Sequence, residues 1–171
     1  MGRVTIIGNA AGGKSTLCKK LKISKGLPLF AVDALQWKPG WTQAPREEVV
    51  TGIREIISKD RWIIDGWGPW ETIEERFERS DTIILIDHRI WIHFWWATKR
   101  QIKAFLFPGS VEKPEGCDLV PVTLKMFQLI WMIHKITRPK LLELAEKFSN
   151  RKDVFHIRSP KELKLFMAIH C

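Results

Sequence analysis

The sequence predicts an α/β fold in which a five-stranded parallel sheet is covered by helices on both faces. Short apolar runs alternate along the chain with segments of helical spacing, and each run is apolar at successive positions, as in strands buried on both faces. A glycine-rich segment that ends in Lys14-Ser15 separates the first run from the first helical segment. Later runs end in Asp33, Asp65 and Asp87. Because ligands bind at the carboxyl ends of parallel strands, these observations predict a single cleft at that edge of the sheet.

The pattern of apolar residues gives the expected elements. Runs rich in β-branched residues predict strands at residues 4–7, 29–32, 61–66, 82–87 and 153–157. Helical spacing predicts helices at residues 14–24, 46–59, 71–79, 90–105, 122–136 and 139–149. The capping box Ser159-Pro160-Lys161-Glu162 begins a last helix. Residues 36–44 and 107–121 are rich in Gly and Pro and predict loops.

Length and composition indicate one domain and set limits on the partners. A chain of 171 residues fits a single core. The net charge of +9 favours nucleotides, nucleic acid or acidic surfaces as partners. Three widely spaced cysteines argue against disulfides and zinc and for a reducing compartment. Residues 83–96 and 124–136 are apolar but interrupted by charges, and both are shorter than the ~20 residues that a membrane span requires. We therefore expect a cytoplasmic protein with no signal peptide and no membrane partner.

The segment Gly8-Asn9-Ala10-Ala11-Gly12-Gly13-Lys14-Ser15-Thr16 matches the phosphate-binding pattern G-x-x-x-x-G-K-S. Its glycines permit the backbone to wrap a phosphate with successive N–H groups. Lys14 is placed to reach the β- and γ-phosphates, and the Ser15 hydroxyl is a ligand for Mg²⁺. The helix that begins at this point directs its positive end at the anion. The segment therefore predicts binding of ATP or a similar nucleotide with Mg²⁺.

Two acids at strand ends are candidates for the magnesium site together with Ser15. A magnesium site beside phosphates commonly uses one or two carboxylates, and both Asp65 and Asp87 end apolar runs. We favour Asp65, because the run Ile63-Ile64-Asp65-Gly66 has the pattern of the strand that neighbours the phosphate-loop strand. The alternative for each acid is a structural cap after its strand.

Further residues are candidates for the side of the cleft that binds a phosphate acceptor. Asp33 is placed to orient or deprotonate an acceptor hydroxyl as a general base, or to cap a turn. Trp37 and Trp41 are placed either to stack on a base or sugar or to close the loop onto the core. Arg100 is the cation chosen to stabilise the transferring phosphoryl group. Arg76 and Arg79, which follow the third strand, are further candidates for the acceptor side. The residues that the sequence thus assigns to the substrate are Asp33, Trp37, Asp65, Gly66 and Arg76.

The whole chain resembles the adenylate-kinase-like P-loop proteins that are often labelled DNA topology modulation proteins. The phosphate loop is common to many families, whereas the stretch Asp33-Ala34-Leu35-Gln36-Trp37-Lys38-Pro39-Gly40-Trp41 is much more specific. The stretches that carry the resemblance are residues 6–17, 32–41, 45–48, 61–66, 79–87 and 138–142.

The resemblance implies a nucleoside- or nucleotide-kinase-like fold with five parallel strands. It implies an acceptor-binding region at about residues 33–60, a mobile lid at about residues 100–121, and ATP with Mg²⁺ at residues 8–16. Asp33 resembles the acid that related small-molecule kinases carry after the second strand. One departure concerns the acceptor: Gly66 is followed by Trp67-Gly68-Pro69-Trp70, without the arginine that adenylate kinases place there. This departure argues against AMP.

Three functions stay open at this point. The first is a small-molecule kinase of the nucleotide or nucleoside type that transfers the γ-phosphate of ATP to an unidentified acceptor. The second is a nucleotide-gated DNA-binding regulator of topology with little transfer activity, for which nucleic acid would be a partner. The third is an interaction protein or homodimer that uses the apolar stripe at residues 126–133.

Overall fold

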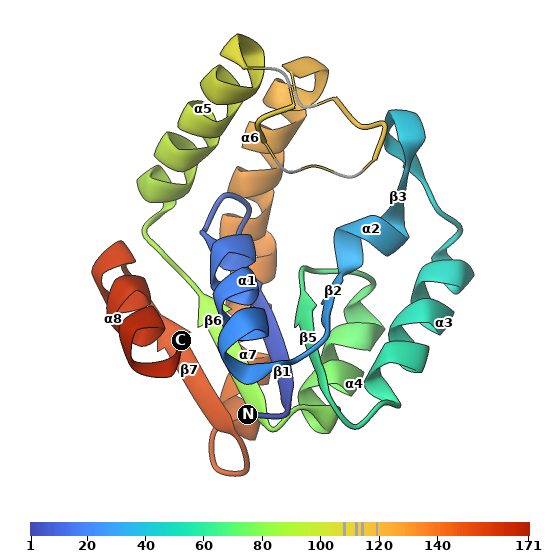
Figure 1. Cartoon of the computed structure of the whole chain (residues 1–171), viewed down its shortest axis with the longest axis vertical. Coiled ribbons are helices and arrows are strands. Elements are labelled where there is room, and N and C mark those ends of the chain that lie inside the picture. The colour runs from blue at the N-terminus through green and yellow to red at the C-terminus, as the bar shows by residue number, and fades with distance from the viewer. Residues whose placement is uncertain (108, 112, 114, 119) are drawn as a thin grey trace.

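The centre of the molecule is a sheet of five parallel strands in the order β2-β5-β1-β6-β7 (Figure 1). The computed structural model describes residues 1–107, 109–111, 113, 115–118 and 120–171, and the statements below concern those residues. The predicted lid and the predicted loop at residues 107–121 include Pro108, Glu112, Pro114 and Leu119, which lie outside the described residues. The strands are β1 (Arg3–Gly8), β2 (Leu29–Ala31), β5 (Trp62–Asp65), β6 (Thr82–Ile86) and β7 (Asp153–Ile157). The predicted α/β fold and the parallel sheet are confirmed.

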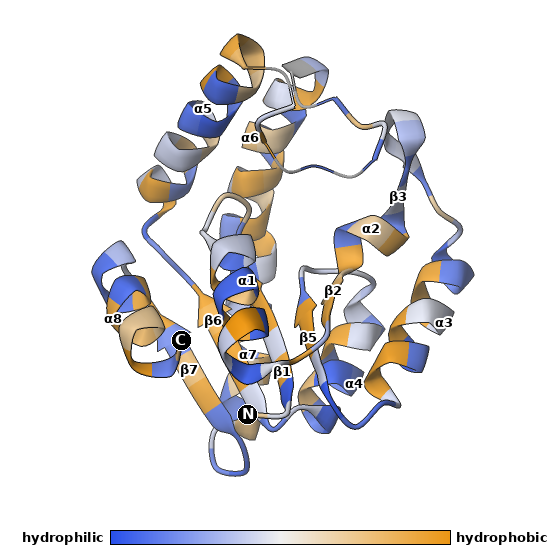
Figure 2. Ribbon diagram, in the orientation of Figure 1, coloured by the Kyte–Doolittle hydropathy of each residue, from blue (hydrophilic) through white to orange (hydrophobic). Residues whose placement is uncertain are grey.

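Helices cover both faces of the sheet, because the side chains of buried strands alternate between the two faces. In Figure 1, α1 (Lys14–Lys25) and α8 (Pro160–His170) lie in front of the sheet, and α4 (Trp70–Arg79) and α7 (Arg138–Phe148) lie behind it. Val4, Ile6 and Ile84 pack with the front helices, whereas Ile7 and Ile83 pack with the rear ones. A third cluster packs α3 (Arg46–Ile57) onto β5 through Trp62 and Ile64. Figure 2 shows the strands as the apolar centre between helices with mixed surfaces.

The register of the strands brings their carboxyl ends to one edge. Ile6 of β1 pairs with Asp65 of β5, and Ala31 at the end of β2 pairs with the same Asp65. On the other side of β1, Gly8 pairs with Ile86, the last residue of β6. The four chain segments that follow these strands therefore begin next to one another, as the sequence predicts.

The segment after β2 differs from the loop expected at residues 36–44. A short helix, α2 (Val32–Gln36), begins directly after β2 and takes Val32 out of the predicted strand. It is followed by an antiparallel hairpin, in which β3 (Trp37–Lys38) pairs with β4 (Thr42–Gln43) across the turn η1 (Pro39–Trp41). These elements are too short for a periodic pattern, so the composition alone indicated a loop.

The helix after the predicted lid also differs from its expected form. Two helices with a break near residue 137 were expected, but α6 (Thr123–Met132) continues into α7 through η3 (Ile133–Thr137), a π-helical turn. Pro139 in the first turn of α7 explains this turn. In a regular α-helix its ring would collide with the carbonyl group four residues earlier, and a wider turn relieves that collision. Of the helices described, none is long and apolar enough to cross a membrane.

Truncation of Phe77 tests the packing of the rear layer. Phe77 of α4 is fully buried, and its ring lies 5.9 Å from the ring of Phe148 in α7. We expect Phe77→Ala to lower the free energy of unfolding by about 3–5 kcal/mol, because the change leaves a cavity between α4, α7 and the sheet. The exposed Glu74→Ala on the same helix is the matched control, with an expected change within about 0.5 kcal/mol. Denaturant titration measures both, and equal effects would contradict the packing.

Candidate functional site

The phosphate-binding segment leaves β1 at Gly8, where the backbone passes very close to β6. A Cβ atom on Gly8 would lie 2.1 Å from the carbonyl oxygen of Ile86, so no other residue fits here without moving one of the two strands. The loop ends at Gly13, which has a φ of 84° and precedes the first residue of α1. This left-handed conformation is one that glycine adopts without strain. The glycines at the two ends of the motif are therefore required by geometry.

The positive charge of the site is concentrated inside this loop. The Nζ atom of Lys14 donates to the carbonyl oxygens of Gly8 at 3.1 Å and Asn9 at 2.8 Å. No acidic residue lies in the first turn of α1, so the positive end of the helix is not neutralised there. The indole Nε1 of Trp67 donates to the same Gly8 oxygen at 2.9 Å. Lys14 and Trp67 thus hold the entry to the loop in a conformation suited to an anion.

Two further side chains tie the loop to the helices above the sheet. The Nδ2 atom of Asn9 donates to the Ile130 carbonyl oxygen in α6 at 2.9 Å, and its Oδ1 atom accepts from the Ala10 amide at 2.8 Å. His93 of α5 (Ile90–Leu106) donates from Nδ1 to the Ala10 carbonyl oxygen at 2.8 Å. Burial lowers the pKa of His93 to about 4, so the ring is neutral at pH 7. Both helices therefore position the loop from outside.

Ser15 and Asp65 form the pair that the sequence favours for magnesium. The Ser15 hydroxyl donates to Asp65 Oδ2 at 3.0 Å. The second oxygen, Oδ1, is buried and has no hydrogen-bond partner among the described residues. Burial raises the pKa of Asp65. The charge of Lys14 and the hydrogen bond from Ser15 lower it and so offset part of this rise. A hydroxyl and a carboxylate with an unpaired oxygen, next to a phosphate-binding loop, fit the oxygen ligands that Mg²⁺ prefers.

Asp87 is a correction to the sequence-based assignment, because both of its oxygens are engaged by basic side chains. Arg138 Nε donates to Oδ1 at 2.5 Å and Nη2 to Oδ2 at 2.9 Å, and His156 Nε2 lies 2.7 Å from Oδ2. Although burial opposes ionisation, the hydrogen bonds to His156 and Arg138 lower the pKa of Asp87. Asp87 therefore joins β6 to α7 and β7, and both of its oxygens already accept hydrogen bonds.

Asp33 lies at the carboxyl end of β2, near the turn that follows β5. It is exposed in the first turn of α2, directly after the end of β2. Its Oδ1 atom lies 3.8 Å from the point that a Cβ atom would occupy on Gly66, the residue after Asp65. Gly66 itself is buried with a φ of 112°. The two acids thus face the same space from adjacent strands, one exposed and one partly buried.

Arg76 is also a correction, since it is fully buried rather than open to an acceptor. Its guanidinium group donates to the carbonyl oxygens of Gly66 (from Nη1, 2.8 Å), Trp67 and Thr72 (from Nε, 3.2 Å). Burial lowers the pKa of Arg76 to about 9, so the group is still charged at pH 7. Arg76 therefore stabilises the turn between Asp65 and Trp67 through hydrogen bonds to its backbone. Arg79, about one turn further along α4, is exposed.

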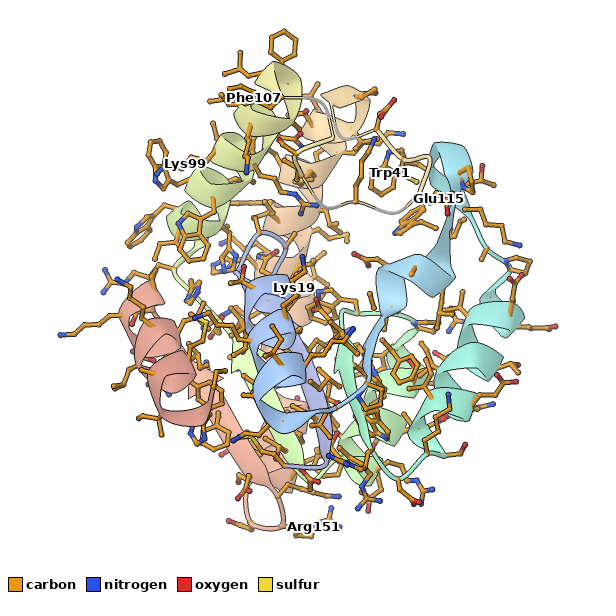
Figure 3. The ribbon with its side chains drawn as sticks, in the orientation of Figure 1. Lys19, Trp41, Lys99, Phe107, Glu115 and Arg151 are labelled. Carbon is orange, nitrogen blue, oxygen red and sulfur yellow. The ribbon has the colours of Figure 1, made fainter. Side chains whose placement is uncertain are left out.

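The hairpin after α2 is bonded to the segment between α5 and α6. The amide of Gly40 donates to the Gly116 carbonyl oxygen at 2.9 Å, and Trp41 Nε1 donates to the Asp118 carbonyl oxygen at 2.6 Å. Cys117 is buried and donates from Sγ to the Lys38 carbonyl oxygen at 3.4 Å. Figure 3 shows Trp41 beside this segment near Glu115. These bonds hold the hairpin against the segment that joins α5 to α6.

The aromatic residues of the hairpin lie together. The Trp37 ring contacts the Trp41 ring edge-on, with centroids 5.6 Å apart. Trp41 donates to the segment between α5 and α6, while Trp37 lies half-buried at the start of the hairpin. Arg100, the predicted catalytic cation, is half-buried on α5.

The structure places Lys14, Ser15, Asp65 and Asp33 at the carboxyl ends of β1, β5 and β2, and it buries Arg76. Asp87 lies at the end of β6 near Gly8 and Asn9, where Arg138 and His156 bind it. Sequence reasoning did not identify Trp67 or His93 as supports of the phosphate loop. A histidine within the apolar first half of α5 was a signal for His93, but its partner is a backbone oxygen, which no residue pattern marks.

The strand order, the loop between β1 and α1, and the helices on both faces define the P-loop kinase fold. No family model and no curated protein matches the sequence. The chain is similar to the solved structure of shikimate kinase from Acinetobacter baumannii in complex with shikimate, with a TM-score of 0.60, 12% identity, and coverage of 99% of this chain and 93% of that one. It is also similar to shikimate kinase from Bacteroides thetaiotaomicron, with a TM-score of 0.50, 12% identity, and coverage of 98% and 95%. At these identities the likeness shows the fold.

Replacement of Arg76 tests whether this residue supports the site rather than binds an acceptor. We expect Arg76→Met to lower the free energy of unfolding by at least about 2 kcal/mol, because buried carbonyl oxygens at Gly66 and Trp67 lose their donors. Arg79→Met, at an exposed position of the same helix, is the control and is expected to have little effect. Thermal and denaturant unfolding measure both. A stable Arg76→Met protein with a raised KM for an acceptor would instead return Arg76 to the acceptor side.

Proposed function

We propose that this protein is an ATP-dependent kinase that transfers the γ-phosphate to a hydroxyl group of a small molecule. The observation that carries the proposal is the pairing of Ser15 with Asp65, which leaves a buried carboxylate oxygen unpaired beside the phosphate loop. The P-loop kinase fold and the exposed Asp33 at the neighbouring strand end support it. An acid that faces the acceptor side and a cation inside the loop are the groups that phosphoryl transfer needs.

Each residue has a role in this mechanism. The loop amides and Lys14 bind the phosphates of ATP and stabilise the charge that develops on the transferring group. Asp33 orients the acceptor hydroxyl and accepts its proton as the new O–P bond forms and the bond from the γ-phosphorus to the β,γ-bridging oxygen breaks. Ser15 and Asp65 would hold Mg²⁺, which when bound neutralises the phosphate oxygens. Arg100 on α5 is the proposed additional cation, and residues 100–121 are the proposed lid.

The ion pairs of the proposed acceptor-binding region favour an acceptor without an anionic group. Three cations of the proposed acceptor-binding region are each bonded to a glutamate. Lys38 Nζ lies 3.0 Å from Glu48 Oε2, Arg46 Nη2 lies 2.7 Å from Glu71 Oε2, and Arg54 Nη2 lies 2.6 Å from Glu75 Oε1. Such exposed pairs are weak, but they compensate the charge that a phosphate or carboxylate would require. We therefore propose a neutral polyol or nucleoside as acceptor rather than a nucleoside monophosphate.

The alternative of a DNA-binding regulator of topology rests on the net charge and on the sequence resemblance, and it stays a prediction from the sequence. It differs from the kinase in a measurable way. A regulator would bind duplex or single-stranded DNA with an affinity that falls steeply with salt and would give no phosphorylated product.

The direct test is acceptor-dependent consumption of ATP with Mg²⁺. The panel contains nucleosides and sugar alcohols as neutral acceptors, and nucleoside monophosphates and shikimate as anionic ones, with the product identified by phosphorus NMR. We expect a phosphorylated product with a neutral acceptor. Failure of the whole panel to yield any product would sink the proposal, and a product only with an anionic acceptor would overturn the choice of acceptor class.

Two substitutions separate nucleotide binding from transfer. Lys14→Ala is expected to weaken ATP binding and to abolish transfer, whereas the exposed Lys20→Ala on the same helix is expected to change neither. Asp33→Asn is expected to lower kcat by about 10²- to 10⁴-fold while the Kd for ATP stays within about threefold, because only proton acceptance is lost. Asp153→Asn, at an exposed position at the start of β7, is the control. Unchanged kcat in Asp33→Asn would remove Asp33 from the chemistry.

A further inference from the structure

Helices α5 and α6 carry an unusual amount of exposed apolar surface. Most of the large apolar side chains that are exposed in the described part of the chain lie between Trp91 and Ile136. Phe105 is 69% exposed and Leu124 is 76% exposed. We call this set the α5–α6 face, which consists of Trp91, Trp95, Ile102, Phe105, Leu106, Phe107, Leu124, Leu129, Trp131, Met132 and Ile136.

The two helices form one unit, so their exposed side chains belong to one part of the molecule. Phe94 of α5 and Phe127 of α6 are in contact, with ring centroids 5.8 Å apart. Gln101 Nε2 donates to Met126 Sδ at 3.5 Å further along the pair. Because these inner contacts hold α5 against α6, the outer sides of both helices face solvent. Figure 2 shows α6 as one of the most apolar helices of the structure.

The exposed residues of α5 recur at helical spacing. Trp91, Trp95, Ile102 and Leu106 are separated by four, seven and four positions, which places them on one side of the helix. The opposite side carries His93, which binds the phosphate loop. The apolar stripe is therefore not the inward side of a helix that the core covers, and it has no covering element among the described residues.

The charge of the α5–α6 face has one sign. Neither α5 nor the stretch from α6 through η3 contains an acidic residue. The cations on these elements are Lys99, Arg100, Lys103, Lys125, His134 when protonated, and Lys135.

Several cations lie directly beside the tryptophans. Lys99 Nζ is 4.6 Å from the centroid of the Trp95 ring, and Lys135 Nζ is 5.2 Å from that of Trp131. Arg89, just before α5, lies 5.1 Å from the Trp91 ring. Figure 3 shows Lys99 and Phe107 along the outer side of α5. Exposed tryptophans and positive charges thus lie side by side on both helices.

Charge complementarity selects one occupant for this surface. A second copy of the chain would bring two cationic surfaces together, which like-charge repulsion opposes. A nucleic acid would match the cations but would leave the exposed Leu, Ile, Met and Phe side chains without an apolar partner. An anionic lipid bilayer satisfies both, since tryptophans and lysines collect at the headgroup level while aliphatic and Phe side chains enter the acyl boundary.

We propose that the α5–α6 face docks onto the surface of an anionic lipid bilayer, with the helices lying in the interface and not crossing it. The proposal goes beyond the kinase function and does not depend on it. It replaces the sequence-based expectation that the protein has no membrane partner. That expectation rested on the absence of a spanning segment, which says nothing about a helix that lies on the surface.

The test uses the full chain without ATP and vesicles of phosphatidylcholine with or without about 30% phosphatidylserine, a composition of the anionic type that polybasic surfaces recognise. Flotation measures bound protein, and a blue shift of tryptophan emission reports insertion. We expect binding to the anionic vesicles, weak or no binding to neutral ones, and release by salt, since the lipid surface potential is screened.

Matched variants locate the binding surface. Lys99→Gln is expected to weaken vesicle binding about fivefold, because one cation near the surface contributes about 1 kcal/mol. Trp95→Ser is expected to weaken binding further and to remove part of the blue shift. Lys20→Gln and Trp70→Ser are the controls, since both residues are exposed outside the α5–α6 face. Circular dichroism establishes that each variant is folded.

The outcomes separate the possible occupants. Weaker binding by the α5–α6 variants, with unchanged binding by the control variants, supports the proposal. No vesicle binding, or equal binding by all variants, overturns it. A dimer that Trp95→Ser dissociates, without vesicle binding, overturns it in favour of a second copy. Salt-dependent binding of duplex DNA without vesicle binding overturns it in favour of nucleic acid. None of these results depends on phosphorylation of an acceptor, so failure of the kinase assay leaves this test intact.

Discussion

The contact between the backbones of Gly8 and Ile86 is the constraint on which the site depends. Because Gly8 has no side chain, β1 can end against β6 and turn at once into the phosphate loop. The carbonyl group of Gly8 accepts hydrogen bonds from Lys14 of α1 and from Trp67 after β5. Two separate elements therefore fix the start of the loop. The position of Asp65 follows, since its strand is held in register with β1. A shift of one residue at this point would move all of these groups.

The sequence predicted the parts of the structure that local patterns specify. Strands were found because continuous β-branched runs such as Ile83-Ile84-Leu85-Ile86 have few alternatives, and the phosphate loop was found because its spacing is fixed by backbone geometry. The meeting of strand ends followed from the parallel topology alone. The patterns did not specify elements of two or three residues, such as the hairpin of β3 and β4. They also did not specify the continuous helix through Pro139.

The site assignments that failed did so for one physical reason. Asp87 and Asp65 each end a buried strand, and nothing in the local sequence distinguishes them. They differ because Arg138 and His156, far along the chain, reach Asp87, whereas Asp65 keeps an unpaired oxygen. Arg76 likewise follows a strand in the sequence and was therefore a candidate for substrate binding. In the structure its side chain lies on the inner side of α4 and donates to the backbone of Gly66. Long-range partners decide which charged groups stay available, and a single sequence does not show them.

The hydrogen bonds that the described residues make between the hairpin and the segment after α5 end on main-chain oxygens, those of Gly116, Asp118 and Lys38. A carbonyl group is the same at every residue, so these bonds recognise the path of the chain and not the identity of the side chains that provide them. Only the donors Trp41 and Cys117 are specific. The contact between the hairpin and this segment therefore depends on the course of the backbone and on two side chains, Trp41 and Cys117. Substitutions of the other hairpin side chains are expected to leave it in place.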